Sequence, residues 1–355
     1  MPWTVRAVPL PDGDQPADLW VDAAGCLAAD PVPDAELLPG RYVVPGLVDA
    51  HAHPAVGMDA GLPVARSPAE ASAVLARWAE SGVCLVRDTG SPGGLVLQLD
   101  ITAGMPSVQA AGRFLAPPGR YFPALLPEGV PEEQLTELAL GELARGARWV
   151  KVIADFPPVV DGRPAGPAAL TYSRDAVAAM VAAVHAAGGR VAAHATTDAV
   201  ADLVRAGVDS VEHGVAIDEP ALRLMAQTGA AWTPTLCAVL RLPDDAPDAV
   251  RRRNADHRGR LRELLPLARR LGVPVLAGTD SAGTIAREVA LLAENGLEPA
   301  EALAAATTTG YRVLGESHGQ PGQPATLVTY QDDPRQDLAV LSSPAAILIN
   351  GVRVR

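Results

Sequence analysis

Two histidines stand two residues apart at the end of an apolar run. The run covers residues 43–48, and His51 and His53 follow it in the segment Asp49-Ala50-His51-Ala52-His53-Pro54. Residues two apart on a strand face the same side, so both imidazoles can reach one point in space. Imidazole is the commonest neutral metal ligand near pH 7. The pair is therefore half of a metal site, or else two histidines satisfied by ordinary hydrogen bonds.

Other residues that can hold a metal stand within or just after later apolar runs. Together with the first pair, the set is His51, His53, Lys151, His194, His213 and Asp280. In a barrel of parallel strands, the carboxyl ends of the strands meet at one face, where active sites lie. We therefore expect these side chains, which include four of the seven histidines, to meet at the mouth of a barrel.

Lys151 and Asp280 each allow two interpretations. Burial lowers the pKa of an unpaired ammonium, and the neutral amine of Lys151 can react with carbon dioxide to form a carbamate that bridges two metals. Alternatively, Lys151 reaches solvent or pairs with Asp155. Asp280 can take a proton from an activated water and pass it to a leaving group. It can also cap the helix that follows it, and both roles can hold at once.

Strand and helix patterns alternate eight times along the middle of the chain. The predicted strands are 42–48, 83–87, 107–111, 149–154, 190–194, 210–213, 231–237 and 273–279. The predicted helices are 67–80, 131–146, 173–187, 197–206, 220–228, 251–271, 285–294 and 299–307. This alternation predicts an α/β fold with a (β/α)8 TIM barrel. A doubly wound open sheet is the alternative, but it usually carries a Gly-rich phosphate turn after its first strand, which is missing here.

Both ends of the chain have β character instead. Residues 1–42 contain short strands broken by turn residues, and Asn350-Gly351 is a hairpin turn near the other end. The predicted strands of the tail are 326–330, 338–341, 346–349 and 352–354. We expect residues 1–42 and 323–355 to form one small composite β-sandwich domain beside a barrel of residues 43–322.

Composition excludes several classes of function. The formal net charge of −12 leaves no basic surface for nucleic acid or an anionic membrane. No stretch approaches the roughly 20 apolar residues that cross a bilayer, and the N-terminus lacks the apolar core of a signal peptide. Three widely separated cysteines give no disulfide framework. We expect a cytoplasmic enzyme with a small-molecule substrate, and the Ala- and Leu-rich helix faces would allow a homo-oligomer.

Five segments resemble the metal-dependent amidohydrolase superfamily, and most closely its imidazolonepropionase-like and Xaa-Pro dipeptidase-like branch. The segments are Val44-Pro45-Gly46-Leu47-Val48-Asp49-Ala50-His51-Ala52-His53, Val150-Lys151-Val152, Val191-Ala192-Ala193-His194, Ser210-Val211-Glu212-His213-Gly214 and Ala277-Gly278-Thr279-Asp280-Ser281. The resemblance spans essentially the whole chain. It implies a binuclear centre, usually of zinc, bridged by the carbamate of Lys151. Asp280 would bind the more buried metal and shuttle protons. The imidazole ligands would be His51 and His53 for the buried metal, and His194 and His213 for the second.

The expected function is cleavage of an amide, peptide-like or related C–N or ester bond by a metal-dependent hydrolase. A mononuclear deaminase or a cyclic-amide ring-opening hydrolase is the alternative, although Lys151 would have no role in that chemistry. A barrel without catalysis, which serves as a scaffold, is a third reading. It would be expected to lack metal ligands, whereas the full set is present here.

The loops after the strands depart from the family pattern. His194 is followed by Ala-Thr-Thr where dipeptide-cleaving relatives often carry Tyr-Gly or His-Gly, and residues 117–122 replace a frequent Gly-Gly-His. These positions tend to contact substrate, so the sequence does not assign dipeptidase specificity. An arginine at 120 or 241 could bind a substrate carboxylate or form a surface ion pair, and residues 241–257 are long enough for a lid. The candidates for substrate contact are Arg120, Tyr121, Phe156, Arg241 and His257.

Overall fold

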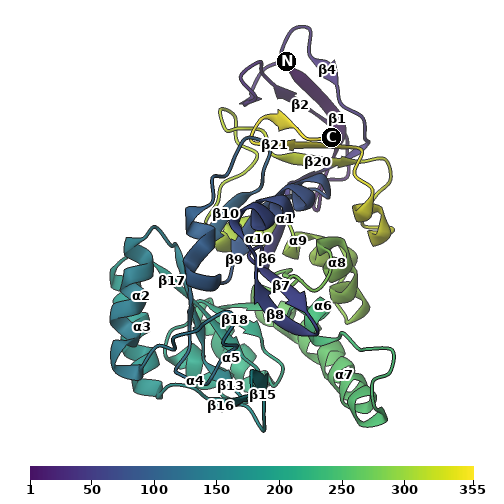
Figure 1. Ribbon diagram of the computed structural model, residues 1–355. Helices are drawn as coiled ribbons and strands as arrows, with labels where there is room; N and C mark the ends of the chain where they lie inside the picture. The colour runs from purple at the N-terminus through teal and green to yellow at the C-terminus, as the bar shows by residue number, and fades with distance from the viewer.

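A curled, mostly parallel sheet occupies the larger part of the chain in the computed structural model, which describes residues 1–355 (Figure 1). Its strands pair in the orders β10-β9-β6 and β11-β12-β17-β18-β19, with every pairing parallel. These strands are β6 (Leu47–Ala52), β9 (Val83–Asp88), β10 (Ser107–Ala110), β11 (Phe114–Leu115), β12 (Trp149–Ile153), β17 (Arg190–Ala195), β18 (Ser210–His213) and β19 (Ala231–Thr233).

Residues 273–279 connect the last of these strands with the first. Val275 forms a parallel bridge with Trp232 of β19, and the Ala277 carbonyl accepts a hydrogen bond from the Ala50 N–H of β6 at 2.9 Å. The predicted strand 273–279 does not form as a regular strand: Val275 makes one isolated bridge, and the Ala277 N–H bonds to the Ala305 carbonyl instead of to a neighbouring strand. Residues 273–279 thus link β19, the last strand of the curled sheet, with β6, the first.

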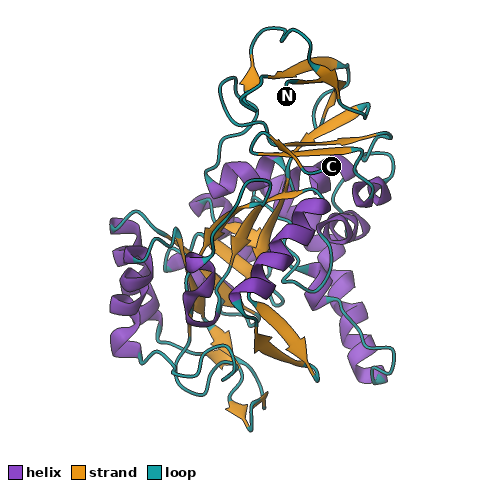
Figure 2. Cartoon of the chain, turned by 45° about the horizontal axis from the view of Figure 1, so that its top comes forward, coloured by secondary structure: helices purple, strands orange, loops and turns teal.

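Helices and strands alternate along the chain, and the helices lie around the sheet (Figures 1 and 2). The helices are α1 (Pro68–Glu80), α2 (Leu135–Ala144), α3 (Arg174–Ala186), α4 (Val200–Arg205), α5 (Glu219–Thr228), α6 (Leu236–Val239), α7 (Asp248–Leu271), α8 (Ile285–Glu294), α9 (Pro299–Ala305) and α10 (Thr308–Leu314). Two short 3₁₀ helices are η1 (Pro92–Gln98) and η2 (Glu132–Gln134). Local sequence explains where several begin. In α1, for example, Ser67 and Glu70 form the capping box that their spacing predicts.

The two ends of the chain share a second sheet, above the first in Figure 1. Its order is β22-β21-β20-β5-β1-β2-β3, with β4 beside β1. The strands are β1 (Trp3–Pro9), β2 (Ala17–Val21), β3 (Leu27–Ala28), β4 (Glu36–Leu37), β5 (Tyr42–Pro45), β20 (Leu327–Tyr330), β21 (Ala346–Ile349) and β22 (Val352–Arg353). A separate apolar cluster that includes Trp3, Val21 and Leu348 packs against this sheet. The N- and C-terminal segments therefore meet, as the sequence predicts.

Several other predicted elements differ from the structure. The run 42–48 divides at Gly46 into β5 of the second sheet and β6 of the first, and a Cβ at Gly46 would lie 2.3 Å from that of Cys84. The predicted strand 338–341 is wrong, because Asp337 caps a 3₁₀ helix there, η3 (Leu338–Ser342). The strand predicted over 231–237 ends at Thr233, and α6 follows it. The helix predicted from residue 251 begins three residues earlier.

Three hairpins in the loops were not predicted, because each has strands of only two to four residues. They are β7 (Val56–Asp59) with β8 (Leu62–Ala65), β13 (Asp155–Phe156) with β16 (Ala169–Leu170), and β14 (Val159–Val160) with β15 (Arg163–Pro164). They lie away from the second sheet (Figures 1 and 2). None of the helices combines the length and the apolar character needed to cross a membrane.

Candidate metal centre

The six predicted ligands come from five segments of the curled sheet. β6 carries His51, with His53 directly after its last residue, β12 carries Lys151, and the remaining three stand at or after the ends of later strands. Those three are His194 near the end of β17, His213 as the last residue of β18, and Asp280 directly after residues 273–279. The structure thus brings side chains that are up to 229 positions apart to one end of the sheet.

His51, His53 and Asp280 form a compact group in which one ligand atom of each lies within 4.8 Å of the others. Asp280 Oδ1 is 3.5 Å from His51 Nε2 and 3.2 Å from His53 Nε2. Burial by itself would raise the pKa of Asp280, but hydrogen bonds with the two histidines outweigh it and hold that pKa well below its usual value. The group therefore combines two imidazoles with an ionised carboxylate, a donor set that suits a divalent metal.

Hydrogen bonds fix the imidazoles in the form that metal binding requires. His51 Nδ1 lies 2.5 Å from the Glu212 carboxylate, and His53 Nδ1 lies 2.8 Å from the Gly90 carbonyl. Because both partners accept, each Nδ1 must carry a proton, so Nε2 is the nitrogen that a metal would bind. Both Nε2 atoms face Asp280, and that of His53 also lies 3.3 Å from the Thr89 hydroxyl.

His213 is held in the same tautomer. Its Nδ1 is 2.7 Å from Thr235 Oγ1, and that hydroxyl donates its own proton to the Pro234 carbonyl at 2.8 Å. The hydroxyl must therefore accept from His213 Nδ1, so Nε2 again carries the lone pair. Trp232 Nε1 fixes the backbone by donating to the His213 carbonyl at 3.0 Å. In three of the four imidazoles, Nδ1 is thus held by an acceptor, and Nε2 is the nitrogen left for a metal.

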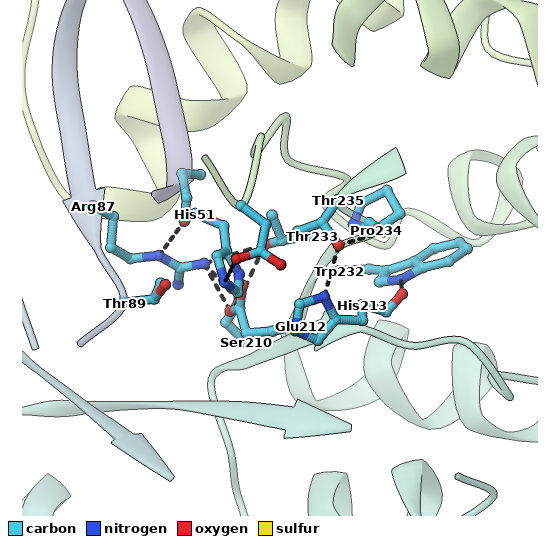
Figure 3. A network of polar contacts seen from close by, with 12 residues as sticks. His51, Arg87, Thr89, Ser210, Glu212, His213, Trp232, Thr233, Pro234 and Thr235 are labelled. Atoms are coloured by element: carbon cyan, nitrogen blue, oxygen red, sulfur yellow. Dashed lines mark hydrogen bonds and ion pairs between the residues drawn. The ribbon is translucent and has the colours of Figure 1, made fainter. Parts of the chain in front are cut away.

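A buried ion pair lies behind His51 (Figure 3). Arg87 Nη2 is 2.7 Å from one oxygen of Glu212, whose other oxygen binds His51. Arg87 also donates to the Ala50 carbonyl at 2.5 Å, and Ser210 donates to Glu212 at 2.5 Å. Burial opposes ionisation of Glu212, but the charge of Arg87 prevails and holds its pKa well below the usual value. Glu212 is therefore an ionised acceptor that orients His51.

His194 and His213 stand next to each other, with ring centroids 4.5 Å apart. The His213 ring is also 5.0 Å from the ring of His51. Burial, and after it the charge of Lys151, lowers the pKa of His194 to about 4, and burial lowers that of His213 well below its usual value. Both imidazoles are neutral near pH 7, which is the state that binds a metal.

Lys151 is buried, and its Nζ has no hydrogen-bond partner. Burial lowers its pKa to about 8, although the charges of Glu212 and Asp280 act in the opposite direction. Asp155 is not its partner, because that carboxylate accepts hydrogen bonds from the backbone and hydroxyl groups of Thr196 and Thr197 at 2.7–2.8 Å. The interpretations in which Lys151 pairs with Asp155 or reaches solvent are therefore wrong.

Asp280 is not a helix cap either. The next helix, α8, begins at Ile285, and the hydroxyl of Thr284 caps it. Asp280 instead has a positive φ of 50°, and its N–H donates to the His51 carbonyl at 2.7 Å. This backbone bond aims the carboxylate at His51 and His53. About a quarter of its side chain stays exposed, so water can reach it.

A sequence model of the amidohydrolase family matches residues 42–354. The chain belongs to the amidohydrolase family. It is therefore a hydrolytic enzyme that acts on carbon–nitrogen bonds, as the sequence predicted. The group of His51, His53 and Asp280 could hold a metal ion of the kind on which the family generally depends.

Relatives of this amidohydrolase match it over nearly its whole length. Uncharacterized proteins of Mycobacterium tuberculosis and Mycobacterium bovis are each 34% identical over 361 residues, which is 98% of this chain and 94% of theirs. A solved Xaa-Pro dipeptidase with bound methionine is 22% identical, with a TM-score of 0.80 and 99% coverage of both chains. The A. niger ochratoxinase is 20% identical with the same TM-score, over 100% and 95% of the two chains. These structures share the TIM-barrel-type fold.

The substrate candidates of the amidohydrolase fall into two groups. Tyr121 and Phe156 lie near the predicted ligands, in an aromatic cluster described below. Arg120 instead donates through Nη2 to backbone carbonyls of the β13–β16 hairpin. Arg241 is exposed between α6 and α7, and His257 is half-buried within α7, where burial lowers its pKa to about 4. Within the segment 241–257, residues 248–257 belong to α7.

Sequence reasoning missed the residues that support the ligands. Arg87 ends one predicted strand and Thr235 lies inside another, and neither has a spacing that signals its partner. Asp49 belongs to the first motif without a predicted role of its own. It accepts from Thr279 through both the N–H and the hydroxyl, at 3.0 and 2.6 Å, and so ties β6 to the segment that carries Asp280. Its position two residues before His51, on the same face of the strand, was an available signal.

Proposed function

We propose that this amidohydrolase is a binuclear metal hydrolase that cleaves an amide, peptide-like or related C–N or ester bond. The curled sheet is then a (β/α)8 barrel of residues 43–322, with residues 1–42 and 323–355 as a small composite β-sandwich domain. The names of two solved neighbours, a dipeptidase and an ochratoxinase, fit such a reaction. Location in the cytoplasm and assembly into a homo-oligomer stay predictions from the sequence.

Lys151 is the observation that carries the binuclear proposal. It is the only lysine of the chain, beside 28 arginines. The single amine is buried without a partner, where an unpaired ammonium would be unfavourable. Conversion to a carbamate with carbon dioxide would give that position an anionic oxygen donor. This supports a bridge between one metal position at His51, His53 and Asp280 and a second at His194 and His213.

The residues present would hold two divalent cations, of which zinc suits the imidazole and carboxylate donors best. Such ions supply a Lewis acid that polarises a carbonyl and makes water more acidic. Asp280 is the ionised, partly exposed base that would take the proton of the attacking water and return it to the leaving nitrogen. Glu212 and Thr235 would keep His51 and His213 in the required tautomer.

The lone lysine makes the test direct. Protein prepared with zinc and ¹³C-labelled bicarbonate should contain two zinc ions per chain and show one protein-bound ¹³C carbonyl signal by NMR. Lys151→Met preserves a long apolar chain at the buried position but cannot form a carbamate. It should lose the signal and about one zinc ion. Unchanged zinc content in this variant, with no carbamate in the wild type, would contradict the binuclear proposal.

A mononuclear deaminase or ring-opening hydrolase is the second candidate. It is favoured by the fact that His51, His53 and Asp280 alone form a compact donor group, within 4.8 Å. One zinc ion per chain in both the wild type and Lys151→Met would move the assignment to this chemistry. Heterocyclic amines and cyclic amides would then be the substrates to screen.

A further inference from the structure

A cluster of four aromatic residues lies beside the candidate metal centre. All three phenylalanines of the sequence pack with one tyrosine in a single cluster, which we name the aromatic wall: Phe114, Tyr121, Phe122 and Phe156. Neighbouring ring centroids lie 5.0 to 5.4 Å apart in tilted or edge-to-face geometry. These are the arrangements that aromatic pairs prefer, so the wall is a preformed surface.

The wall contacts an imidazole at each end. The Phe114 ring lies 5.4 Å from the ring of His53, and the Phe156 ring lies 5.7 Å from that of His194. His53 belongs to the first proposed metal position and His194 to the second, so the wall extends beside both. A substrate group next to the bond that is cleaved would therefore lie within reach of these rings.

The protein covers only part of the wall. Phe114 and Phe156 are buried, whereas Tyr121 and Phe122 remain partly exposed. A cavity of about 270 Å³ borders Tyr121 and is otherwise lined mainly by prolines, glycines, Leu126 and Val159. Removing apolar surface from water is favourable, so a bound apolar group would be stabilised here.

Charge further restricts the group that this region can accept. The only charged residue that lines the cavity is an acid, Asp161. Arg120 precedes Tyr121 in the sequence but does not line the cavity. Its Nη2 donates to the carbonyls of Phe156 and Ala169 at 2.6 and 2.7 Å, and its Nε is buried without a hydrogen-bond partner. Arg120 therefore braces the β13–β16 hairpin behind the wall. A carboxylate placed in the cavity would face an acid and no cation.

On the basis of the proposed function, we propose that the aromatic wall selects the substrate. It takes an uncharged aromatic or bulky apolar group that adjoins the scissile bond, and it discriminates against a group that carries a free carboxylate. The loop that supplies Tyr121 and Phe122 is the one in which residues 117–122 replace the family's frequent Gly-Gly-His. The specificity of this chain therefore differs from that of relatives with that motif.

Hydroxamates test the proposal through binding, without a known substrate. The zinc-loaded protein would be titrated calorimetrically with acetohydroxamate, benzohydroxamate and succinohydroxamate, which share a zinc-chelating head but end in a methyl, a phenyl or a carboxylate-bearing group. Benzohydroxamate should bind about 10- to 100-fold more tightly than acetohydroxamate, as burial of one aromatic ring predicts. Succinohydroxamate should bind no more tightly than acetohydroxamate.

Single substitutions then show which residues cause the preference for benzohydroxamate over acetohydroxamate. Tyr121→Ala and Phe122→Ala change partly exposed rings, and each should reduce the benzo-to-aceto affinity ratio several-fold with zinc content unchanged. Tyr42→Ala, the same substitution at a partly buried tyrosine of the second sheet, should leave the ratio as in the wild type.

The outcomes separate the wall from the metal centre. Equal affinities for acetohydroxamate and benzohydroxamate, or a preference for succinohydroxamate, would overturn the role of the wall alone. A ratio of benzohydroxamate to acetohydroxamate affinity that stays unchanged in both Tyr121→Ala and Phe122→Ala would also overturn the role of the wall. If none of the three hydroxamates binds the zinc-loaded protein, the proposed metal centre is wrong, and the role of the wall falls with it.

Discussion

Replacing Arg87 by methionine should destabilise this amidohydrolase far more than replacing an exposed arginine. Arg87 is fully buried, and its Nη2 lies 2.7 Å from the equally buried carboxylate of Glu212. Without Arg87, that carboxylate stays inside the sheet with only His51 and Ser210 as partners. Removing one partner of a buried ion pair costs about 3–5 kcal/mol of unfolding free energy.

A double variant separates the unpaired charge from the lost volume. Arg87→Met with Glu212→Gln leaves no buried charge, so it should be less destabilised than Arg87→Met alone. Arg205→Met is the control, because Arg205 pairs with Asp202 at 2.9 Å while 63% of its side chain is exposed. That exposed pair should contribute less than about 1 kcal/mol.

Urea denaturation of the metal-free proteins, followed by tryptophan fluorescence and circular dichroism, measures these differences. Metal-free protein is required because bound zinc would add its own stabilisation. The reasoning is refuted if Arg87→Met costs no more than Arg205→Met. It is also refuted if adding Glu212→Gln makes Arg87→Met worse, because the penalty would then not come from the unpaired carboxylate.

Three further predictions address the pH dependence, the proton carrier and a close contact. Burial raises the pKa of Glu288 from 4.5 to about 8. Between about pH 5 and pH 8, the native state therefore holds a proton that the unfolded state has lost. The unfolding free energy of the wild type should consequently fall, relative to that of Glu288→Gln, as the pH rises from about 5 to 8. Denaturation midpoints at several pH values measure this, and a constant difference would contradict it. Asp280→Asn should abolish nearly all turnover while most zinc remains by elemental analysis, whereas full activity would exclude Asp280 as the proton carrier. A Cβ at Gly278 would lie 2.6 Å from His51 Cβ, so Gly278→Ala should cost about 1–3 kcal/mol of unfolding free energy and lower the zinc content. An unfolding free energy and a zinc content equal to those of the wild type would show that His51 can move freely.

The side chains predicted as ligands could be placed near one another from the sequence because they follow local rules. Alternation by two places His51 and His53 on one face of a strand, and the ends of successive parallel strands gather the others. The supports of these ligands follow no local rule. Arg87 and Glu212 are 125 residues apart, and their pairing depends on two strands that are not adjacent in the sheet.

The direction of a side chain was equally inaccessible from the sequence. The residue types at 120 and 121 suggested one substrate-contacting pair, yet Arg120 bonds to a hairpin whereas Tyr121 joins the aromatic wall. That difference arises from the β13–β16 hairpin, whose two-residue strands leave too short a pattern to detect. The 3₁₀ helix after Asp337 was missed for a similar reason, since its apolar run resembles a short strand.

The sheet that joins the two chain ends has a consequence for synthesis on the ribosome. β5 pairs with β20, and Tyr42 lies opposite Tyr330, so β5 has no partner on that side until residues 327–330 have been translated. During that interval β5 presents an open strand edge, which is a template for pairing with other nascent chains. Chains truncated before residue 327 should therefore be captured by chaperones or aggregate, even where the α/β part is complete, and folding yield should depend on how quickly β20 is translated after β5.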